Sequence, residues 1–326
     1  MRLGMVGTNF VSDMFMEGVR ENPKVEVVAV CSGHYENALK FQKKYNIAAA
    51  YESMEEMAEK AEMDAVYIAT PNSMHHDHAI FFLNKKIPVY CEKPMATNAR
   101  EVKEMIEVAR KNNTYLMEGL LPMYLPGLDA LKSKIADCGP LRNAAIVFCK
   151  YSSRYDAYLQ GENPTTFRNE LSNGAAMDLG VYCLAVCMAV LGKPSKIMAN
   201  ATLLDTGVDA GFNAILQYDD FNAMLAASKC SDTNIFSEIS GEKGTIQIPG
   251  VSVLKQILFQ KRGEALAPVF ENNNTPFKYT IENFVRDIEE GKKEPTLYPF
   301  DQCIALHETL TEIREQCGVI YKSDMF

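Results

Sequence analysis

The sequence predicts an α/β protein in which a doubly wound parallel sheet is followed by an α+β domain with a large, mostly antiparallel open sheet. Strand-like and helix-like segments alternate up to about residue 120, which is typical of a parallel sheet with helices on both faces. Beyond that point several strand-like runs follow one another with short turns and no intervening helix. The chain has 326 residues, too many for one compact core. We therefore predict two domains, over residues 1–120 and 121–326.

The first domain is predicted from five apolar runs and the helical segments between them. Predicted strands cover residues 2–7, 25–32, 63–70, 87–92 and 114–119, and predicted helices cover residues 11–22, 36–46, 53–62, 75–86 and 97–113. Two helix starts carry a capping signal, because Ser53 precedes Glu56 by three positions and Asn98 precedes Glu101 likewise.

The second domain has a different pattern. A helix over 126–139 and a strand over 141–151 come first, followed by a polar loop over 152–176 and an apolar helix over 177–192. Predicted antiparallel strands then cover 195–204, 210–219, 222–229, 237–248 and 254–261, and helices over 280–291 and 301–317 end the chain.

Composition excludes several classes of protein. Hydrophobic residues make up 47% and charged residues 23%, as in globular proteins, and no apolar run approaches the roughly 20 residues that span a bilayer. The amino terminus has no signal-peptide pattern, so we expect a cytoplasmic protein without a membrane partner. The net charge of −9 and the absence of a basic stripe argue against nucleic acid and leave a small molecule as the expected partner. The nine cysteines form no C-x-x-C pair, and Cys183 and Cys187 are interpreted as core residues rather than metal ligands.

The turn after the first strand is ambiguous by itself. In Gly7-Thr8-Asn9-Phe10-Val11-Ser12 only the first glycine of a G-x-G-x-x-G dinucleotide fingerprint is present, and a plain strand–helix turn explains it better when no other motif is considered. Asn9 tolerates a left-handed φ, and Ser12 is small enough for close helix–strand packing. The backbone amides near Thr8 to Phe10 would then face a pyrophosphate.

Three further motifs change that interpretation. The stretches "ATPNSMHHDHA" (69–79), "IPVYCEKPMATN" (87–98) and "NGAAMDLGVYCL" (173–184) occur in this order, with "SGEKGTIQI" (240–248) after them. Together they resemble the glucose–fructose oxidoreductase / inositol dehydrogenase (Gfo/Idh/MocA) family of NAD(P)-dependent oxidoreductases over essentially the whole chain. The resemblance implies a Rossmann dinucleotide-binding domain over 1–120 and a substrate-binding and oligomerisation domain over 121–326, and it makes the opening turn a cofactor site.

The resemblance also implies which residues bind the cofactor. They are Gly7, Thr8, Asn9, Phe10, Ser32, Gly33, His34, Thr70, Pro71, Asn72, His75, Glu92 and Lys93. Ser32 stands where an NAD enzyme normally has Asp or Glu, which would repel a 2′-phosphate. We therefore expect NADP to be preferred, with NAD possible, and His34 or Lys40 to supply the positive charge.

The expected catalytic residues are Lys93, Asp178 and Tyr182. Many family members carry histidine four residues after the aspartate, whereas the tyrosine here resembles dihydrodiol dehydrogenase and NADP-dependent xylose dehydrogenase. Lys93 would stabilise a developing alkoxide and lower the pKa of the Tyr182 phenol, which would act as acid/base while Asp178 orients the site. Outside this motif Tyr182 would be interpreted as a half-buried helix residue.

Substrate contacts are expected from the polar loop, with exposed loop residues an equally good interpretation. The candidates are Arg154, Tyr155, Arg168 and Asn173. Met123 stands where relatives often have arginine, which removes a cation from the pocket edge. The "HHDH" run lacks further ligands, so no metal site is expected.

The predicted function is hydride transfer between nicotinamide and a secondary alcohol or carbonyl of a sugar, polyol or trans-dihydrodiol. The alternative is a non-catalytic NAD(P)-binding sensor of the same fold, which would not need Lys93, Asp178 and Tyr182 together. A hydride shuttle between two sugars with tightly held cofactor is less favoured, because no long amino-terminal export and arm segment precedes the first strand. We expect a homodimer, or a dimer of dimers, through the late sheet, whose strands carry "NAILQY" and "NAMLAAS".

Overall fold

The computed structural model describes residues 1–325 and divides into two compact units. The first comprises Met1–Gly119 with Asn274–Ile304, and the second comprises Leu120–Asn273 and the chain from Ala305 onward. Residues 274–304, which the sequence-based division gave to the second domain, thus belong to the first unit. The reason is packing, because the ring of Phe277 lies edge-on against Phe15 with ring centroids 5.8 Å apart.

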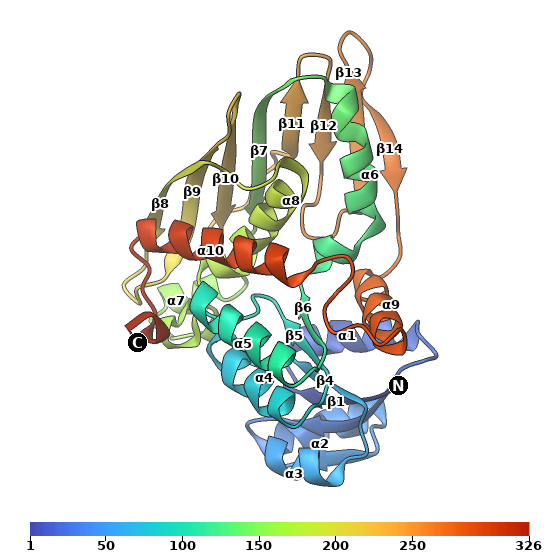
Figure 1. Cartoon of the computed structure of the whole chain (residues 1–326). Coiled ribbons are helices and arrows are strands. Elements are labelled where there is room, and N and C mark those ends of the chain that lie inside the picture. Colours follow the sequence, from blue (N-terminus) through green and yellow to red (C-terminus); the bar gives the residue numbers. More distant parts are fainter. Residues whose placement is uncertain (326) are drawn as a thin grey trace. The chain divides into compact units, whose positions relative to one another are not determined.

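The first unit contains a parallel sheet of the order β3-β2-β1-β4-β5-β6 (Figure 1). Its strands are β1 (Arg2–Val6), β2 (Glu26–Cys31), β3 (Ala49–Tyr51), β4 (Ala65–Ile68), β5 (Val89–Glu92) and β6 (Leu116–Gly119). Its helices are α1 (Phe10–Arg20), α2 (Tyr35–Tyr45), α3 (Met54–Lys60), α4 (His75–Asn84), α5 (Ala99–Lys111) and α9 (Pro276–Glu289). The doubly wound prediction is confirmed, although the short edge strand β3 was not predicted.

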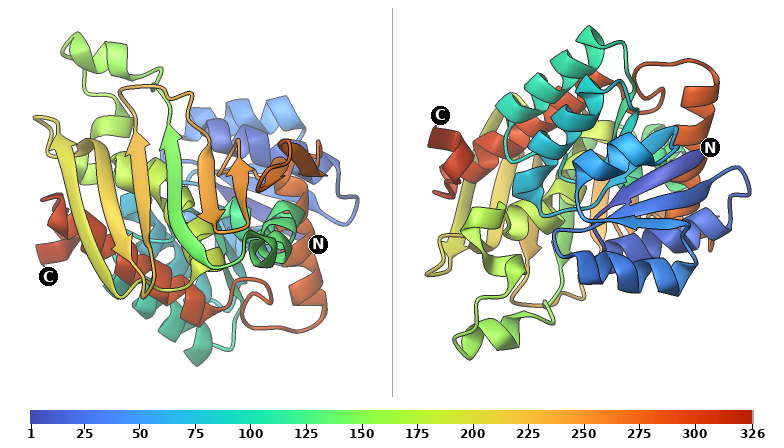
Figure 2. Two further views of the ribbon diagram at one scale, coloured as in Figure 1. Left: turned by 90° about the horizontal axis from the view of Figure 1, so that it is seen from above. Right: turned by 90° about the horizontal axis from the view of Figure 1, so that it is seen from below.

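Helices cover both faces of this sheet, with α1 on one face and the pair α4 and α5 on the other (Figure 2, right). On the α1 face, Phe15 stacks on Tyr67 of β4 with a centroid separation of 3.7 Å, and Tyr90 of β5 meets the same ring edge-on at 5.5 Å. Gly18 lets α9 approach α1, since a Cβ there would lie 2.6 Å from the Cβ of Phe277. These contacts fix α1, and with it the turn that follows β1.

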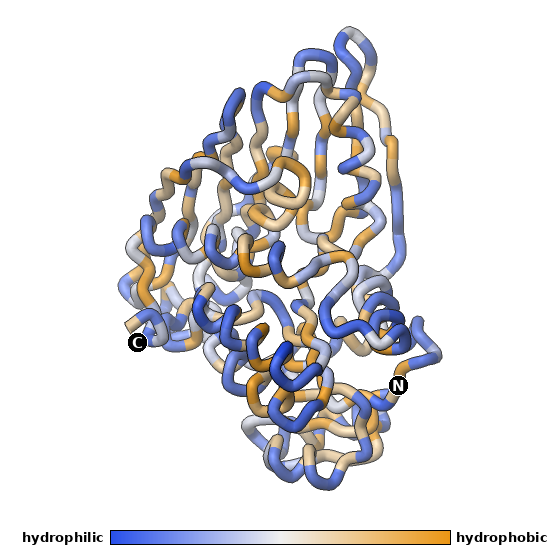
Figure 3. The backbone as a smooth tube through the Cα atoms, in the orientation of Figure 1, coloured by the Kyte–Doolittle hydropathy of each residue, from blue (hydrophilic) through white to orange (hydrophobic). Residues whose placement is uncertain are grey.

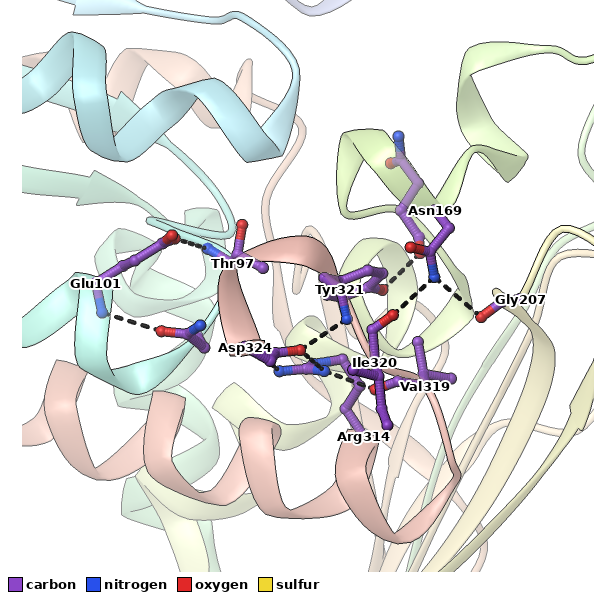
Figure 4. Close-up of polar contacts among 11 residues, drawn as sticks. Thr97, Glu101, Asn169, Gly207, Arg314, Val319, Ile320, Tyr321 and Asp324 are labelled. Atoms are coloured by element: carbon purple, nitrogen blue, oxygen red, sulfur yellow. Dashed lines mark hydrogen bonds and ion pairs between the residues drawn. The ribbon is translucent and has the colours of Figure 1, made fainter. Parts of the chain in front are cut away.

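Both predicted helix caps are present. The Ser53 hydroxyl accepts from the amide of Glu56 at 3.1 Å, and the Asn98 side chain accepts from the amide of Glu101 at 3.0 Å. The Glu101 carboxylate in turn accepts from the amide of Thr97 at 3.0 Å (Figure 4), so orphan amides at this helix start are satisfied.

The second unit contains an open sheet of the order β14-β13-β12-β11-β7-β10-β9-β8. Its strands are β7 (Leu141–Cys149), β8 (Lys196–Leu203), β9 (Asp209–Gln217), β10 (Asn222–Ser228), β11 (Ser237–Gly241), β12 (Gly244–Ile248), β13 (Gln256–Lys261) and β14 (Ala267–Glu271). Its helices are α6 (Pro126–Lys134), α7 (Tyr155–Leu159), α8 (Val181–Leu191) and the greater part of α10 (Phe300–Gln316). The late strands pair antiparallel as predicted, but β7 lies between β10 and β11 and pairs with β10 in parallel.

The two faces of this sheet differ. Helices α6, α8 and α10 lie on one face (Figure 1), and the opposite face is seen with its strands in front in Figure 2 (left). Along β10, Ala223, Leu225 and Ala227 are buried, whereas Met224 between them is 37% exposed. Figure 3 shows hydrophobic positions concentrated along α8 and the strands.

One helical stretch, Asn169–Leu191, is long and apolar enough to cross a membrane, with a mean hydropathy of 1.9. Most of its apolar window, 61%, is buried inside the fold. Packing against the sheet therefore accounts for its hydropathy.

The carboxyl-terminal segment fixes the polar loop that precedes α8 (Figure 4). The fully buried Arg314 donates to both carboxylate oxygens of Asp324, at 2.7 and 2.9 Å, and to the carbonyl of Val319 at 2.6 Å. The Tyr321 hydroxyl donates to the carbonyl of Asn173 at 2.6 Å. Because a bidentate arginine–carboxylate pair is geometrically specific, the end of the chain holds the loop at a defined position.

Candidate active site

The turn after β1 needs the one glycine that it retains. Gly7 has a φ of +103°, and a Cβ there would lie 2.3 Å from the carbonyl oxygen of Ala69. No other residue fits this close approach of the β1 and β4 turns. The buried Ser12 donates from its hydroxyl to the Gly7 carbonyl at 3.0 Å, so its small size serves helix–strand packing as expected.

The expectation that Asn9 adopts a left-handed φ is wrong. Its φ of −82° and ψ of −176° are extended, not left-handed. Asn9 is instead the N-cap of α1, because its side-chain oxygen accepts from the amide of Val11 at 2.9 Å. Its side-chain nitrogen donates to the Ala69 carbonyl at 2.8 Å, which joins the helix start to the turn after β4.

The turn after β2 carries no carboxylate between Cys31 and Tyr35. The Thr8 hydroxyl donates to that of Ser32 at 3.3 Å, so this turn is held against the one after β1. Gly33 and His34 are exposed, and a Cβ at Gly33 would meet nothing within 4 Å. Lys40, on the first turns of α2, is also exposed.

His75 joins the turns that follow β4 and β5. It is 1% exposed, with Nε2 2.8 Å from the carbonyl of Thr70 and Nδ1 2.9 Å from that of Pro94. Burial lowers the pKa of His75 to about 4, so the ring is neutral at physiological pH. His75 therefore holds the two turns next to the predicted cofactor site, and its direct contact with a cofactor stays a prediction.

The other two histidines of the "HHDH" run have separate neighbours. His78 Nδ1 lies 3.1 Å from the Thr70 hydroxyl, and His76 Nε2 lies 3.0 Å from the Glu104 carboxylate. Pro71 and Asn72, the other predicted residues of this turn, are half-buried.

Glu92 and Lys93 stand at the carboxyl end of β5. Glu92 is 5% exposed; its carboxylate accepts from the Tyr67 hydroxyl at 2.8 Å and from the backbone amide of Lys93 at 3.3 Å. Burial raises the pKa of Glu92 to about 7. Lys93 is half-buried at the edge of the sheet where ligands bind in doubly wound folds. Through this backbone contact Glu92 holds the turn that carries Lys93.

In the second unit, Asp178 and Tyr182 occupy an otherwise buried helix. A π-helical turn, η6 (Ala176–Gly180), leads directly into α8. Between Gly174 and Cys187 only Asp178, Leu179 and Tyr182 are not buried. Single π turns within helices are frequent at functional sites. The phenol ring of Tyr182 lies edge-on to Phe148 of β7, with centroids 6.0 Å apart.

A buried lysine that the sequence analysis missed is paired with Asp178. The ammonium of Lys229, which follows β10, lies 2.6 Å from Oδ2 of Asp178. The Lys229 side chain is 3% exposed and that of Asp178 is 36% exposed. Lys229 ends an apolar strand run, and no sequence spacing links it to Asp178.

A second missed residue, Asp209, anchors the start of this helix. It is fully buried, and its Oδ2 accepts from the amide of Ala176 at 2.7 Å. Gly174 has a φ of +142°, and a Cβ there would lie 2.0 Å from Oδ1 of Asp209. Burial raises the pKa of Asp209, while the amide hydrogen bonds and the nearby Lys229 favour its ionised form.

Two of the four substrate candidates hold the polar loop together. Arg168 donates from Nε to the carbonyl of Asn163 at 2.7 Å, and Asn173 donates from Nδ2 to that of Thr165 at 2.9 Å. Arg154 is exposed at the start of α7, and the Tyr155 ring is half-buried in the same helix. Met123, which stands at the family's arginine position, is 5% exposed.

Comparison with known proteins decides the family. Residues 1–120 match the model of the oxidoreductase family with an NAD-binding Rossmann fold, and residues 137–247 match the GFO/IDH/MocA C-terminal domain. Scyllo-inositol 2-dehydrogenase (NADP(+)) of Bacillus subtilis is 37% identical over 99% of each chain. The chain belongs to the Gfo/Idh/MocA family.

Other Gfo/Idh/MocA relatives and structures agree. An uncharacterised oxidoreductase of Escherichia coli is 38% identical over 99% of this chain and 98% of its own, and trans-1,2-dihydrobenzene-1,2-diol dehydrogenase of Danio rerio is 30% identical over 99% of each. The fold matches a 3-ketoreductase from Actinomadura kijaniata, solved with NADP and TDP-benzene, with a TM-score of 0.87 at 20% identity over 98% of this chain and 99% of that one. The protein is thus an NAD(P)-dependent oxidoreductase of the Gfo/Idh/MocA family, which sets aside the sensor interpretation.

The raised pKa of Glu92 predicts a pH-dependent stability. Its pKa rises from 4.5 in the unfolded chain to about 7 in the fold, so the folded state holds this proton more tightly. The contribution of this proton to the free energy of unfolding is fully present below pH 4.5 and is lost as the pH rises to about 7. Relative to wild type, Glu92→Gln should gain on the order of 3 kcal/mol over this range, since one pKa unit corresponds to about 1.4 kcal/mol.

Urea unfolding of both proteins at pH values across this range measures the difference. Glu107→Gln, on the exposed face of α5, is the matched control and should follow wild type at every pH. Parallel pH profiles for wild type and Glu92→Gln would contradict the assignment.

Proposed function

We propose that this enzyme moves a hydride between C4 of the NADP nicotinamide and a secondary alcohol carbon, or the matching carbonyl, of a sugar, polyol or trans-dihydrodiol. The observation that carries the proposal is that Asp178 and Tyr182 are both accessible on a largely buried helix, with the Asp178 carboxylate held by the buried ammonium of Lys229. The activities named for the relatives, on scyllo-inositol and on dihydrobenzenediol, support the substrate class.

The residues of the first unit fit a dinucleotide. The exposed N-terminus of α1, where Asn9 is the cap, presents backbone N–H groups and the positive end of the helix dipole to an anion. Gly7 brings the turn into close contact with the β4 turn, and Thr8 and Ser32 add hydroxyl donors beside it. The cofactor, when bound, supplies or accepts the hydride.

Each proposed catalytic side chain has a distinct task. Lys93 holds the substrate hydroxyl and stabilises the oxyanion that develops as the hydride leaves. In oxidation the Tyr182 phenolate accepts the proton of the substrate hydroxyl and becomes a phenol, and in reduction the phenol returns a proton to the carbonyl oxygen. Asp178 orients the reacting hydroxyl, while Arg154 and Tyr155 remain candidates for substrate contact.

Replacing the phenol tests the acid/base assignment. Tyr182→Phe keeps the ring against Phe148 but deletes the proton, so turnover should fall by about 10²–10⁴ while cofactor affinity and thermal stability change little. Tyr182→His should lose less, because imidazole titrates near neutrality. Turnover is measured by nicotinamide absorbance with a panel of aldoses, polyols and diols.

Tyr218→Phe is the matched control, because that hydroxyl contacts Cys187 and the Gly192 carbonyl at the other end of the same helix. It should retain activity. Near-full activity of Tyr182→Phe would contradict the assignment and favour Lys93 or water as the proton relay.

Cofactor choice is proposed to depend on the turn after β2. Ser32→Asp places a carboxylate where a 2′-phosphate would lie, so NADPH affinity should fall while NADH affinity holds or improves. Fluorescence titration with both cofactors measures this, with Ser133→Asp on exposed α6 as a charge-matched control. Tighter binding of NADH than NADPH by wild type would contradict the preference.

We also propose a cytoplasmic homodimer through the open face of the large sheet. Register places Met198, Ile215, Met224 and Ala145 in one row across β8, β9, β10 and β7. Met198 is 49% and Met224 37% exposed, and a second copy of the chain would cover this apolar row.

A charge in that row should break the dimer. Met224→Lys should lower the mass measured by light scattering at micromolar concentration from that of a dimer to that of a monomer. Met14→Lys, on α1 and similarly exposed at 41%, should leave the assembly unchanged. A monomeric wild type would refute the proposal.

A further inference from the structure

We propose that Lys229 is a positioning residue that keeps Asp178 ionised. It also joins Asp178 to the loop before η6, which carries the rings of Tyr155, Tyr158 and Phe167. This inference rests on the proposed function only in taking Asp178 as part of the active site. None of the motifs that define the family in this sequence includes Lys229.

The backbone of Lys229 is fixed from two sides. Its amide donates to the carbonyl of Ala210 on β9 at 2.8 Å, and its carbonyl accepts from the amide of Ser152, at the start of the loop, at 2.8 Å. The side chain therefore leaves a rigid backbone, so its ammonium has a defined position.

The ammonium of Lys229 is placed between groups from separate elements. It donates to Oδ2 of Asp178 at 2.6 Å and to the hydroxyl of Thr166 at 2.9 Å. It also lies 5.6 Å from the ring centroid of Phe167, within cation–π range. One side chain thus connects the end of β10, the π turn and the short helix η4 (Thr165–Phe167).

The loop that Lys229 contacts through Thr166 and Phe167 carries a cluster of aromatic rings. The Tyr155 and Tyr158 rings stack with centroids 5.7 Å apart, and the Phe167 ring lies 5.6 Å from Tyr155 and 5.5 Å from Tyr158. Moving the Lys229 ammonium would therefore disturb this cluster as well as Asp178.

The positive charge of Lys229 matters because its ammonium is shielded from water, whereas the Asp178 carboxylate is partly exposed. A buried ammonium requires an anion, and the Asp178 carboxylate is in direct contact with it. An opposite charge at this distance favours the ionised carboxylate and lowers its pKa. Without Lys229, Asp178 would take up a proton at higher pH and would no longer accept a hydrogen bond through both oxygens.

Other titratable groups surround the pair and remain in the variants. Asp209 on β9 and Cys230 beside Lys229 interact with the ammonium, Tyr182 follows Asp178 by one turn, Tyr155 on α7 contacts Cys230, and Cys149 on β7 acts on Cys183 of α8. Asp209 interacts with Lys229 through its charge, so it also faces the ammonium.

The experiment compares Lys229→Met and Lys229→Gln, which remove the charge, with Lys229→Arg, which keeps it. The Asp178 carboxyl is followed by ¹³C NMR in aspartate-labelled protein and assigned with Asp178→Asn. We expect its pKa to rise by about one unit or more in the Met and Gln variants and to stay near wild type in the Arg variant. If Lys229→Met fails to fold, Lys229→Gln, which keeps an amide donor for Asp178 and Thr166, gives the same readout.

Kinetics supply a second readout. The acidic limb of the kcat/KM profile should move to higher pH by the same amount, and kcat should fall by up to about 10²-fold through misplacement of Asp178. Lys193→Met, which removes an exposed lysine 3.3 Å from Glu308, should change neither measurement. If Lys229 only stabilised the fold, its replacement would lower the fraction of active enzyme without moving the acidic limb of the kcat/KM profile.

An unchanged Asp178 pKa in both charge-removing variants overturns the proposal, whether or not the enzyme turns over any substrate tested. Absence of wild-type turnover on the whole panel would instead count against the proposed function, and the NMR titration would still decide the role of Lys229. Equal pKa shifts in the Arg and Met variants would also overturn it, because charge would then not be the cause.

Discussion

The buried Asp209 carboxylate fixes the helix on which the proposed chemistry depends. It accepts from the amide of Ala176 at the first turn of that helix, and only glycine at position 174 leaves room for it. An acceptor at a helix N-terminus satisfies an amide that has no partner within the helix. Because this anchor holds the first residue of the π turn, it sets where Asp178 and Tyr182 emerge from a largely buried element.

The same helix start is held from the carboxyl-terminal side. Arg314 and Asp324 pair beneath it, and Tyr321 reaches the carbonyl of Asn173, one residue before Gly174. With Lys229 on the β10 side, charged groups that water hardly reaches surround the site helix. Removing one partner of such a pair leaves an uncompensated charge, so the arrangement favours a single geometry.

In the first unit the turns after β1, β4 and β5 are held together by close backbone contacts rather than by charged pairs. Gly7 and Asn9 both reach Ala69, and the neutral His75 ring lies between the carbonyls of Thr70 and Pro94 and donates to one of them. Three turns at one edge of the sheet are thereby locked to one another. In doubly wound folds ligands bind at this edge of the sheet, where the proposed dinucleotide site lies.

The sequence by itself determined the alternation of strands and helices, the caps at Ser53 and Asn98, the family, and the Lys93, Asp178 and Tyr182 motif residues. These follow from local periodicity and short motifs, which are written in consecutive residues. Only the tertiary structure decided the extended N-cap conformation of Asn9, the burial of His75, the packing of α9 with the first unit, and the partnership of Lys229 with Asp178. Each of these joins residues far apart along the chain, and Lys229 and Asp178 carry no spacing that would reveal a contact made across a sheet and a helix.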